Sequence, residues 1–282
     1  MPELPEVETI RRGLQQGGRG GPAIIGWKIT QADLLWNGVL ATNNEQEFLQ
    51  EIIGQSIVRV DRRAKFLDLN LDHHHILIHL RMSGDIRVEE EQQPVLKHDR
   101  AIFYFENGFR LVFNDPRKFG RIWFIDDPQS ILGRLGPEPL EPLLTPEIFY
   151  QRLSKKNRQI KPLLMDQSFI AGMGNIYTDE ALYQAHLHPL RSSSSLNPGE
   201  AELLLHAIRY QLTEGIRRNG SSIDWVYRGG DFQNNFKVYG KNGQYCLICG
   251  KVIEKIQVGQ RGTHFCPTCQ PISHPQLGDK EG

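Results

Sequence analysis

Two residues near the start of the chain, Pro2 and Glu3, carry groups that suit nucleophilic and acid catalysis. Because Pro2 is small, the initiator methionine can be removed, and Pro2 then has a free secondary amine. An α-amino group has a reference pKa of about 7.7–8.0, so part of it is unprotonated at neutral pH. Such an amine can attack a sugar C1′ and form an iminium directly, which replaces one difficult step by two easier ones. Glu3 is the neighbouring candidate for a proton donor.

The same stretch also fits an ordinary helix N-terminus. Pro5 suits the first turn of a helix, where its missing N–H costs nothing. Val7, Ile10 and Leu14 then fall on one face, and the carboxylate of Glu6 complements the positive helix start. Taken alone, the stretch favours a helix without special chemistry, so the choice depends on the rest of the chain.

A second kind of chemistry is indicated by the four cysteines of the chain. Cys246 and Cys249 form one Cys-x2-Cys pair, and Cys266 and Cys269 form another after sixteen residues. This spacing is typical of a zinc site, and four thiolates complete a tetrahedral structural site without an open position for chemistry. We therefore predict one structural zinc ion, held by a β-hairpin finger.

The elements that must position these residues begin with a β-rich region. Residues 24–124 consist mostly of short β-runs with one predicted helix at 42–53, which favours a sandwich or barrel. The acidic stretch 89–94 is expected to be a solvated loop. The run His73–His75 does not favour a metal site, because adjacent strand residues point to opposite faces. The clearest strands are predicted at residues 57–60, 66–69, 75–80, 101–105 and 110–113.

Beyond residue 126 the sequence pattern becomes helical. Residues 126–146 are rich in proline and acid, which is typical of a connection between domains. Residues 217–236 are polar, aromatic and glycine-bearing, and a loop of this length is usually mobile or functional. Asn175 is expected near the cap of its helix, after a glycine turn. The helices are predicted at residues 146–153, 161–166, 175–185 and 199–217.

Length, composition and charge limit the classes of function. A chain of 282 residues, 39% of them hydrophobic, suggests two domains with proper cores. No run approaches the roughly 18 apolar residues of a membrane helix, and no signal peptide opens the chain, so we expect a cytoplasmic protein without membrane contact. The net charge is zero, yet residues 151–270 carry 15 Lys and Arg against 9 Asp and Glu. A basic face of this kind can bind DNA, because phosphate contacts are local.

Several motifs follow one another along nearly the whole chain. They are Met1–Thr9, His79–Gly84, Asn114–Gly120, Leu135–Pro139, Gly172–Tyr177 and the two cysteine pairs. Together they resemble the formamidopyrimidine-DNA glycosylases (Fpg, or MutM), which excise oxidised purines from DNA. The resemblance implies an α+β protein of two domains. The first is an antiparallel β-sandwich with an N-terminal helix, and the second is a helical domain with a helix-two-turn-helix element and a β-hairpin zinc finger.

The resemblance also implies a chemistry, in which a glycosylase excises the base and then cleaves the strand by β,δ-elimination. It assigns the Schiff base to Pro2 and protonation of the opening sugar to Glu3. Lys65 matches a lysine that handles a phosphate and assists proton transfer, and Arg261 matches the arginine of the final elimination. Glu6 is assigned a supporting role.

Further residues are implied to hold DNA and to fill the space that an extruded base leaves. Arg117 is expected to fill this space and to hydrogen-bond the orphaned partner base. Arg81 stands where the family more usually has glycine. The void-filling wedge is predicted to be Met82, Arg117 and Phe119, and the DNA-binding residues are predicted to be His79, His98, Arg117, Arg158, Lys161 and Asn175.

The predicted partner is double-stranded DNA that contains damaged bases, bound by a monomer. Two other functions stay open: an endonuclease VIII-type glycosylase for oxidised pyrimidines, and a non-catalytic DNA-binding relative. Leu4-Pro5 and the wedge favour the purine branch, and the intact catalytic residues argue against a loss of catalysis. The predicted domains are a catalytic sandwich at 1–130, a linker at 131–146, a helix-two-turn-helix domain with a lesion-closing loop at 147–236, a zinc finger at 237–270 and a disordered tail at 271–282.

Overall fold

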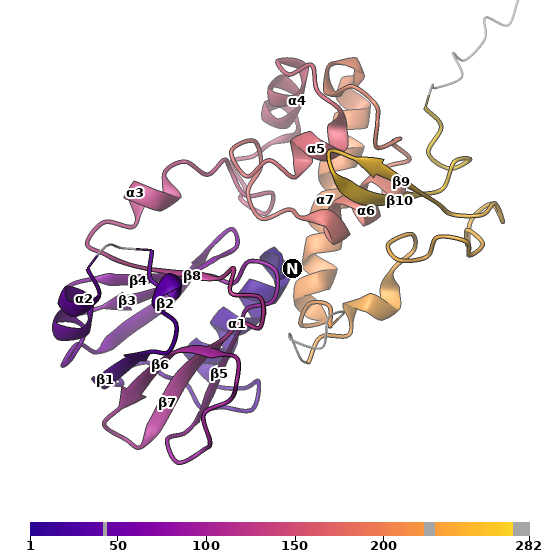
Figure 1. Cartoon of the computed structure of the whole chain (residues 1–282). Helices are drawn as coiled ribbons and strands as arrows, with labels where there is room; N and C mark the ends of the chain where they lie inside the picture. The colour runs from indigo at the N-terminus through magenta and orange to yellow at the C-terminus, as the bar shows by residue number, and fades with distance from the viewer. Residues whose placement is uncertain (42–43, 223–228, 273–282) are drawn as a thin grey trace, which may run out of the picture. The chain divides into compact units, whose positions relative to one another are not determined.

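A computed structural model of the chain describes residues 1–41, 44–222 and 229–272. The chain divides into two compact units (Figure 1). Unit 1 comprises Met1–Arg134 and Gly215–Gln233, and unit 2 comprises Leu135–Glu214 and Asn234–Gly282. The predicted domain boundaries stay predictions, and the tail 273–282 lies outside the described residues.

The first helix of unit 1, α1 (Leu4–Gln16), begins directly after Glu3, which is its N-cap residue. The backbone N–H of Glu3 donates to the Glu6 carboxylate over 2.8 Å. This contact satisfies an amide at the helix start and fixes the direction in which the chain enters the helix. The predicted apolar face is confirmed, because Val7, Ile10 and Leu14 are all buried in the core of the unit.

Two four-stranded antiparallel sheets form the sandwich of unit 1 (Figure 1). Apolar side chains from both sheets and from α1 make one core, as expected for a packed pair of sheets. One sheet has the order β1-β6-β7-β5, with β1 (Ile29–Leu34), β5 (Asp85–Glu90), β6 (Asp99–Phe105) and β7 (Phe109–Asn114). The other has the order β2-β3-β4-β8, with β2 (Ile57–Arg63), β3 (Phe66–Leu71), β4 (His75–His79) and β8 (Arg121–Ile125).

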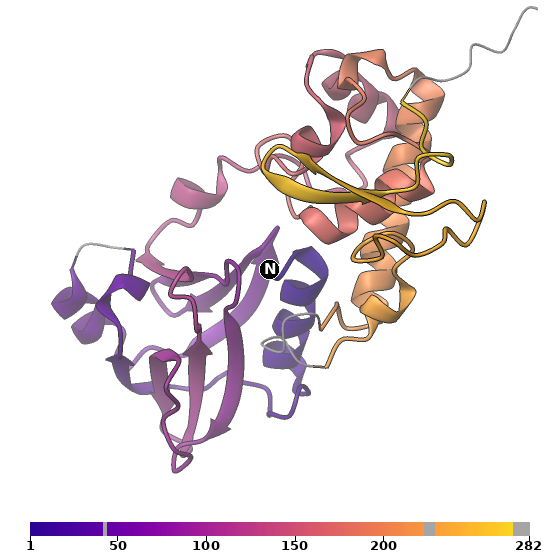
Figure 2. The ribbon, with the colours of Figure 1, turned by 45° about the vertical axis from the view of Figure 1, so that its right-hand side comes forward.

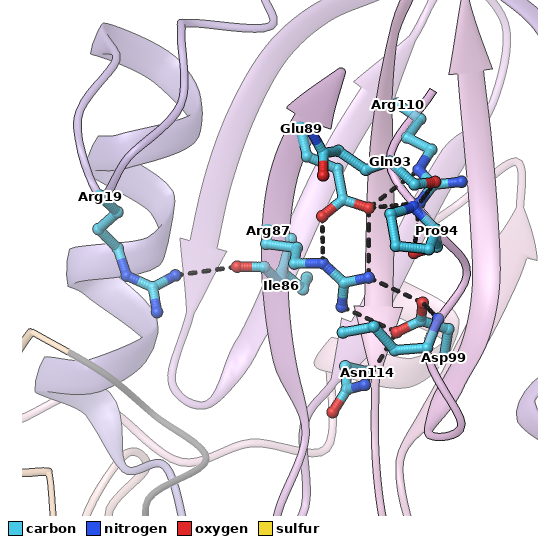
Figure 3. A network of polar contacts seen from close by, with 10 residues as sticks. Arg19, Ile86, Arg87, Glu89, Gln93, Pro94, Asp99, Arg110 and Asn114 are labelled. Carbon is cyan, nitrogen blue, oxygen red and sulfur yellow. Dashed lines mark hydrogen bonds and ion pairs between the residues drawn. The ribbon is translucent and has the colours of Figure 1, made fainter. Parts of the chain in front are cut away.

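The predicted strands are confirmed, and β1, β5 and β8 are additional to them. The prediction of a solvated loop at 89–94 is wrong for Glu89 and Glu90, which belong to β5. Glu89 is paired with Arg87 over 2.5 Å and with the buried Arg110 over 2.6 Å, and Arg87 also reaches Asp99 over 2.7 Å (Figure 3). A chain of partly buried ion pairs therefore explains the position of Glu89 inside a strand.

The histidine run contributes to packing and hydrogen bonding. His75 Nδ1 lies 2.9 Å from the Asp68 carboxylate, whereas His74 stacks on Phe124 with ring centroids 4.4 Å apart. Within residues 1–41, 44–222 and 229–272, the cysteines are the only group of three or more potential ligands gathered closely enough to hold a metal ion.

Unit 2 contains most of the helices that the sequence predicts and the finger hairpin. The hairpin lies beside α6 in both views (Figure 1, Figure 2). No described helix is long and apolar enough to cross a membrane. The helices of unit 2 are α4 (Pro146–Ser154), α5 (Ile160–Leu164), α6 (Asn175–Gln184) and most of α7 (Pro198–Arg217), and the hairpin strands are β9 (Glu254–Val258) and β10 (Arg261–Phe265). Unit 2 also contains the 3-10 helix η2 (Ser193–Ser195), and η3 (Phe232–Asn235) lies where the chain returns to it.

The short helices of unit 1 are η1 (Asn37–Val39), α2 (Glu45–Glu51) and α3 (Gln129–Leu132).

Candidate functional site

The start of α1 and the β2–β3 turn of unit 1 are joined through one arginine. Lys65 lies in this turn, directly after Ala64, whose φ is +52°. Arg62 donates to the carbonyl oxygen of Ala64 over 3.0 Å and to the Glu8 carboxylate over 3.0 Å. The helix that begins beside Pro2 and Glu3 is therefore tied to the turn that carries Lys65.

Glu8 is ionised in this arrangement. Burial raises the pKa of its carboxyl, but hydrogen bonds from Arg11 and Arg12 and the nearby charge of Arg62 outweigh burial and leave the pKa below its usual value. A charged Glu8 holds Arg62 strongly, because a hydrogen bond between ionised partners is about twice as strong as a neutral one. Pro2, Glu3 and Lys65 are buried within this framework.

Glu6 connects the helix start with the segment that follows α7 in the same unit. One carboxylate oxygen accepts the Glu3 N–H, and the other accepts the N–H and the hydroxyl of Ser221 over 2.7 and 3.1 Å. Gly220 has φ +78°, and a Cβ there would lie 2.8 Å from the Glu6 side chain. This close approach requires glycine. Residues 223–228 of the predicted lesion-closing loop lie outside the described residues.

His79 is a neutral hydrogen-bond donor at the end of β4. Burial, and then the charges of Arg81 and Lys65, lower its pKa to about 3. Its Nδ1 accepts the backbone N–H of Arg81 over 3.0 Å, so the proton of the neutral ring is on Nε2. The predicted contact of His79 with DNA stays a prediction, because the ring is buried.

The depressed pKa of His79 predicts a pH-dependent stability. An unfolded histidine takes up a proton below about pH 6.5, whereas the folded ring does so only near pH 3. The neutral His79 therefore makes its full contribution to the free energy of unfolding above pH 6.5. This contribution is lost as the pH falls, by up to about 1.4 kcal/mol per pH unit. We expect His79→Gln to flatten the fall in unfolding free energy between pH 6.5 and 5, measured by urea titration. His73→Gln, at an exposed histidine, is the matched control, and an unchanged pH slope in the His79 variant would contradict the expectation.

The predicted wedge residues lie on two loops of unit 1, after β4 and after β7. Met82 is half-buried, whereas Arg117 and Phe119 are exposed. The Arg117 guanidinium lies 5.0 Å from the centre of the Phe119 ring, a cation–π distance. His98 lies beside the loop that follows β7, because its carbonyl oxygen accepts the backbone N–H of Asp115 over 2.9 Å.

In unit 2, three predicted residues meet at the finger hairpin. Lys161 is completely buried, and its ammonium lies 2.6 Å from the Asp179 carboxylate. The carbonyl oxygen of Gly262 accepts from Lys161 over 3.1 Å and from Asn175 over 3.0 Å. Gly262 directly follows Arg261, which is exposed. Lys161 thus contacts protein groups, and its predicted contact with the DNA backbone stays a prediction.

Arg158 lies apart from this cluster. It is exposed, and its guanidinium is 2.8 Å from the Asp166 carboxylate. Hydrogen bonds from Arg158 and then from Ser168 lower the pKa of Asp166, so the pair is charged at neutral pH. The arginine keeps a solvent-facing position from which a phosphate is accessible.

Two carboxylates on α6 escaped the sequence analysis. Asp179 accepts the His264 N–H over 2.9 Å, and Glu180 accepts the backbone N–H groups of Lys237, Val238 and Tyr239. Both acids are buried. The sequence did hold a signal for them, because they lie on a helix among apolar residues. An acidic side chain on such a buried face needs a hydrogen-bond partner.

The four cysteines fit a zinc ion. Their sulfur atoms all lie within 4.8 Å of one another, with Cys246 and Cys269 separated by 3.8 Å and Cys249 and Cys266 by 3.4 Å. Zinc–sulfur bonds of about 2.3 Å in a tetrahedron require sulfur atoms about 3.8 Å apart. One zinc ion held by these thiolates would be structural, because it has no open position.

Three family models match the chain in sequence. They are the formamidopyrimidine-DNA glycosylase N-terminal domain at residues 1–122, the formamidopyrimidine-DNA glycosylase H2TH domain at 135–226 and a zinc finger found in FPG and IleRS at 243–272. The chain belongs to the formamidopyrimidine-DNA glycosylase family. It is therefore a DNA repair glycosylase with AP lyase activity, and its finger is built for one structural zinc.

Relatives and solved structures agree over nearly the whole length. A formamidopyrimidine-DNA glycosylase of Protochlamydia amoebophila is 42% identical over 96% of this chain and 99% of its own, and one of Herpetosiphon aurantiacus is 43% identical over 96% and 100%. A structure of MutM in complex with DNA containing carbocyclic 8-oxo-G matches with a TM-score of 0.88 and 38% identity over 96% of this chain and 100% of that one. A complex between Lactococcus lactis Fpg and DNA containing an abasic site matches with a TM-score of 0.87 and 37% identity over 95% and 99%. These matches support the formamidopyrimidine branch and not the endonuclease VIII alternative.

Proposed function

We propose that the protein excises oxidised purines, 8-oxoguanine and formamidopyrimidines, from duplex DNA and then cleaves the strand by β,δ-elimination. The observation that carries this proposal is the framework around the start of α1. Glu6 holds the Glu3 backbone over 2.8 Å, and Arg62 joins Glu8 to the turn of Lys65. The framework keeps an amine, an acid and a second amine on rigid elements, as covalent catalysis requires.

In the proposed reaction the Pro2 nitrogen attacks C1′, the bond from C1′ to the damaged base breaks, and the base leaves with the proton that the amine loses. Glu3 gives a proton to the ring oxygen as its bond to C1′ breaks, and the nitrogen lone pair completes the iminium. Loss of a C2′ proton then expels the 3′ phosphate, and a second elimination, with loss of a C4′ proton, expels the 5′ phosphate. Water finally hydrolyses the iminium and releases Pro2. Lys65 and Arg261 assist these proton transfers and hold the phosphates, and Glu6 positions Glu3.

DNA is held in this proposal by residues on both units. In unit 1 the donors are the neutral Nε2–H of His79, His98 and the guanidinium of Arg117. In unit 2 they are Arg158 and Asn175, with Arg261 at the start of β10. Lys161 is buried against Asp179 and supports the hairpin that carries Arg261 through the carbonyl oxygen of Gly262. The excess of basic residues in 151–270 favours phosphate contacts over this part of the chain. We infer that the protein acts as a monomer in the cytoplasm.

The test is excision from synthetic duplexes by the purified protein. We expect rapid release of 8-oxoguanine and formamidopyrimidine, slower release of thymine glycol, and strand products that carry phosphate on both sides of the gap. A preference for thymine glycol would instead assign the pyrimidine branch. Binding without cleavage of any of these duplexes would assign a DNA-binding protein without catalysis.

The wedge should matter for extrusion of the base and much less for the breaking of bonds. Phe119 is 48% exposed, so Phe119→Ala should cost the fold little. We expect this variant to slow excision of 8-oxoguanine from duplex DNA about tenfold or more, since unstacking costs a few kcal/mol, and to keep cleavage at a preformed abasic site within about threefold. Tyr210→Ala, at an exposed aromatic residue of α7, is the control. Equal losses on both substrates would place Phe119 in catalysis or in the core.

A further inference from the structure

A single buried carboxylate connects the two loops that carry the predicted wedge. Asp115 is completely buried. One of its oxygens accepts the hydroxyl of Ser83 over 2.5 Å and the N–H of Arg117 over 3.2 Å. The other accepts the N–H groups of Phe119 and Gly120, each over 2.7 Å. Ser83 directly follows Met82, so residues of both loops donate hydrogen bonds to the same carboxylate.

These contacts hold a strained turn. Lys118, between two residues whose N–H groups bind Asp115, has φ +59°, and Arg81 in the other loop has φ +54°. Left-handed backbone at residues other than glycine is unfavourable and persists only where the surroundings fix it. The turn is also closely packed, since a Cβ at Gly120 would lie 2.3 Å from the ring of Phe113. Without the carboxylate, the N–H groups of Phe119 and Gly120 would lose this acceptor.

The backbone of Asp115 extends the connection to a third segment. Its N–H donates to the carbonyl oxygen of His98 over 2.9 Å, and its own carbonyl oxygen accepts from Arg100 over 2.7 Å. The side chain and backbone of this residue thus contact the loops of Met82 and Phe119 and the segment of His98. All these contacts lie inside unit 1.

We propose that Asp115 is a positioning residue that keeps the two wedge loops in one preformed arrangement before DNA binds. This proposal rests on the proposed function. A preformed wedge enters the base stack without first ordering two loops, which lowers the cost of extrusion. The carboxylate does not touch the reacting sugar in this assignment, so it affects the extrusion step and leaves the elimination steps intact.

The experiment compares Asp115→Asn with the wild-type protein on two substrates. Asparagine keeps the size of the side chain but presents an NH2 group to N–H donors. We expect excision of 8-oxoguanine from duplex DNA to fall about ten- to hundredfold, as the loss of charge-assisted hydrogen bonds implies. Cleavage and borohydride trapping at a preformed abasic site should stay within about threefold. The fluorescence of a 2-aminopurine beside the lesion should rise more slowly in the variant.

Two further variants separate positioning from stability. Ser83→Ala removes one hydrogen-bond donor to Asp115 and keeps the carboxylate, so it should also reduce excision, but only severalfold. Asp68→Asn alters a buried carboxylate of β3 that bonds to His75 over 2.9 Å, and it should not change the ratio of the two activities. Equal loss of excision and abasic-site cleavage in Asp115→Asn, or no loss of either, overturns the role of Asp115. A wild-type protein that releases no damaged purine contradicts the proposed function instead.

Discussion

Borohydride should freeze the protein onto DNA that contains 8-oxoguanine, and the covalent link should map to Pro2. A secondary amine that attacks C1′ must pass through an iminium, and borohydride reduces this bond to a stable amine. We expect mass spectrometry of the digested complex to find the modified sugar on the N-terminal peptide that begins with Pro2. Lys65→Met, which lacks the other nearby amine, should still be trapped.

Two variants make this expectation sharper. A protein that retains Met1 has an amide at Pro2, so base excision should fall by a factor of about 10³ or more, the scale on which loss of a nucleophile acts. Glu3→Gln should slow base release strongly and leave DNA binding largely intact, because it removes the proton and keeps the shape. Trapping at Lys65 with an unmodified Pro2 would contradict the assigned nucleophile even though the family assignment would stand.

Local sequence patterns predicted the helices and strands in which the apolar side chains are the buried ones. The helix after Glu3 was visible because Val7, Ile10 and Leu14 repeat on one face and all three are buried. Strand β3 was visible because Leu67 and Leu69 are apolar and buried, although Asp68 between them is buried as well. The cysteine spacing predicted a cluster that the fold brings together. In each case the chemistry of a few neighbouring residues was enough.

The pattern failed where buried charges pair with one another. Strand β5 alternates aspartate, arginine and glutamate with apolar residues, and its charges are satisfied across the sheet, as in the pair of Arg87 with Asp99. Lys161 and Asp179 were similarly separated in sequence, and only the fold shows that they share a buried ion pair. A charged residue signals solvent on average, so a long-range partner cannot be recognised from a local pattern.

The same limit applies to the supporting residues of the candidate site. The motif around Asp115 was recognised as a whole, yet the sequence did not distinguish the residue that holds the loops from those that face outward. The sequence pattern placed Glu6 at the positive helix start but named no partner for its carboxylate, and its contacts with Glu3 and Ser221 supply two. Such roles depend on hydrogen bonds between residues far apart in the sequence. Ser221 and Glu6, for example, are separated by more than two hundred residues.

Removal of zinc should abolish the finger and weaken DNA binding together. A two-stranded hairpin is marginally stable by itself, and zinc binding releases about 10–16 kcal/mol in finger peptides at neutral pH. The hairpin of β9 and β10 is also held from outside, since Asp179 accepts the His264 N–H and Lys161 donates to Gly262. We expect Cys249→Ser to lose the metal and at least about tenfold in DNA affinity, as the loss of one or two charge-assisted contacts implies.

Metal content, circular dichroism and DNA affinity should be measured on the same preparations. Thr268→Ala changes an exposed residue between Cys266 and Cys269, and it should keep one zinc per chain and normal affinity. The helices of unit 2 should survive in Cys249→Ser, because their core does not include the cysteine at position 249, which is exposed. The loss should therefore be confined to the hairpin and to the phosphate contacts proposed for Arg261. A variant that binds DNA with full affinity without zinc would show that the finger does not serve DNA binding.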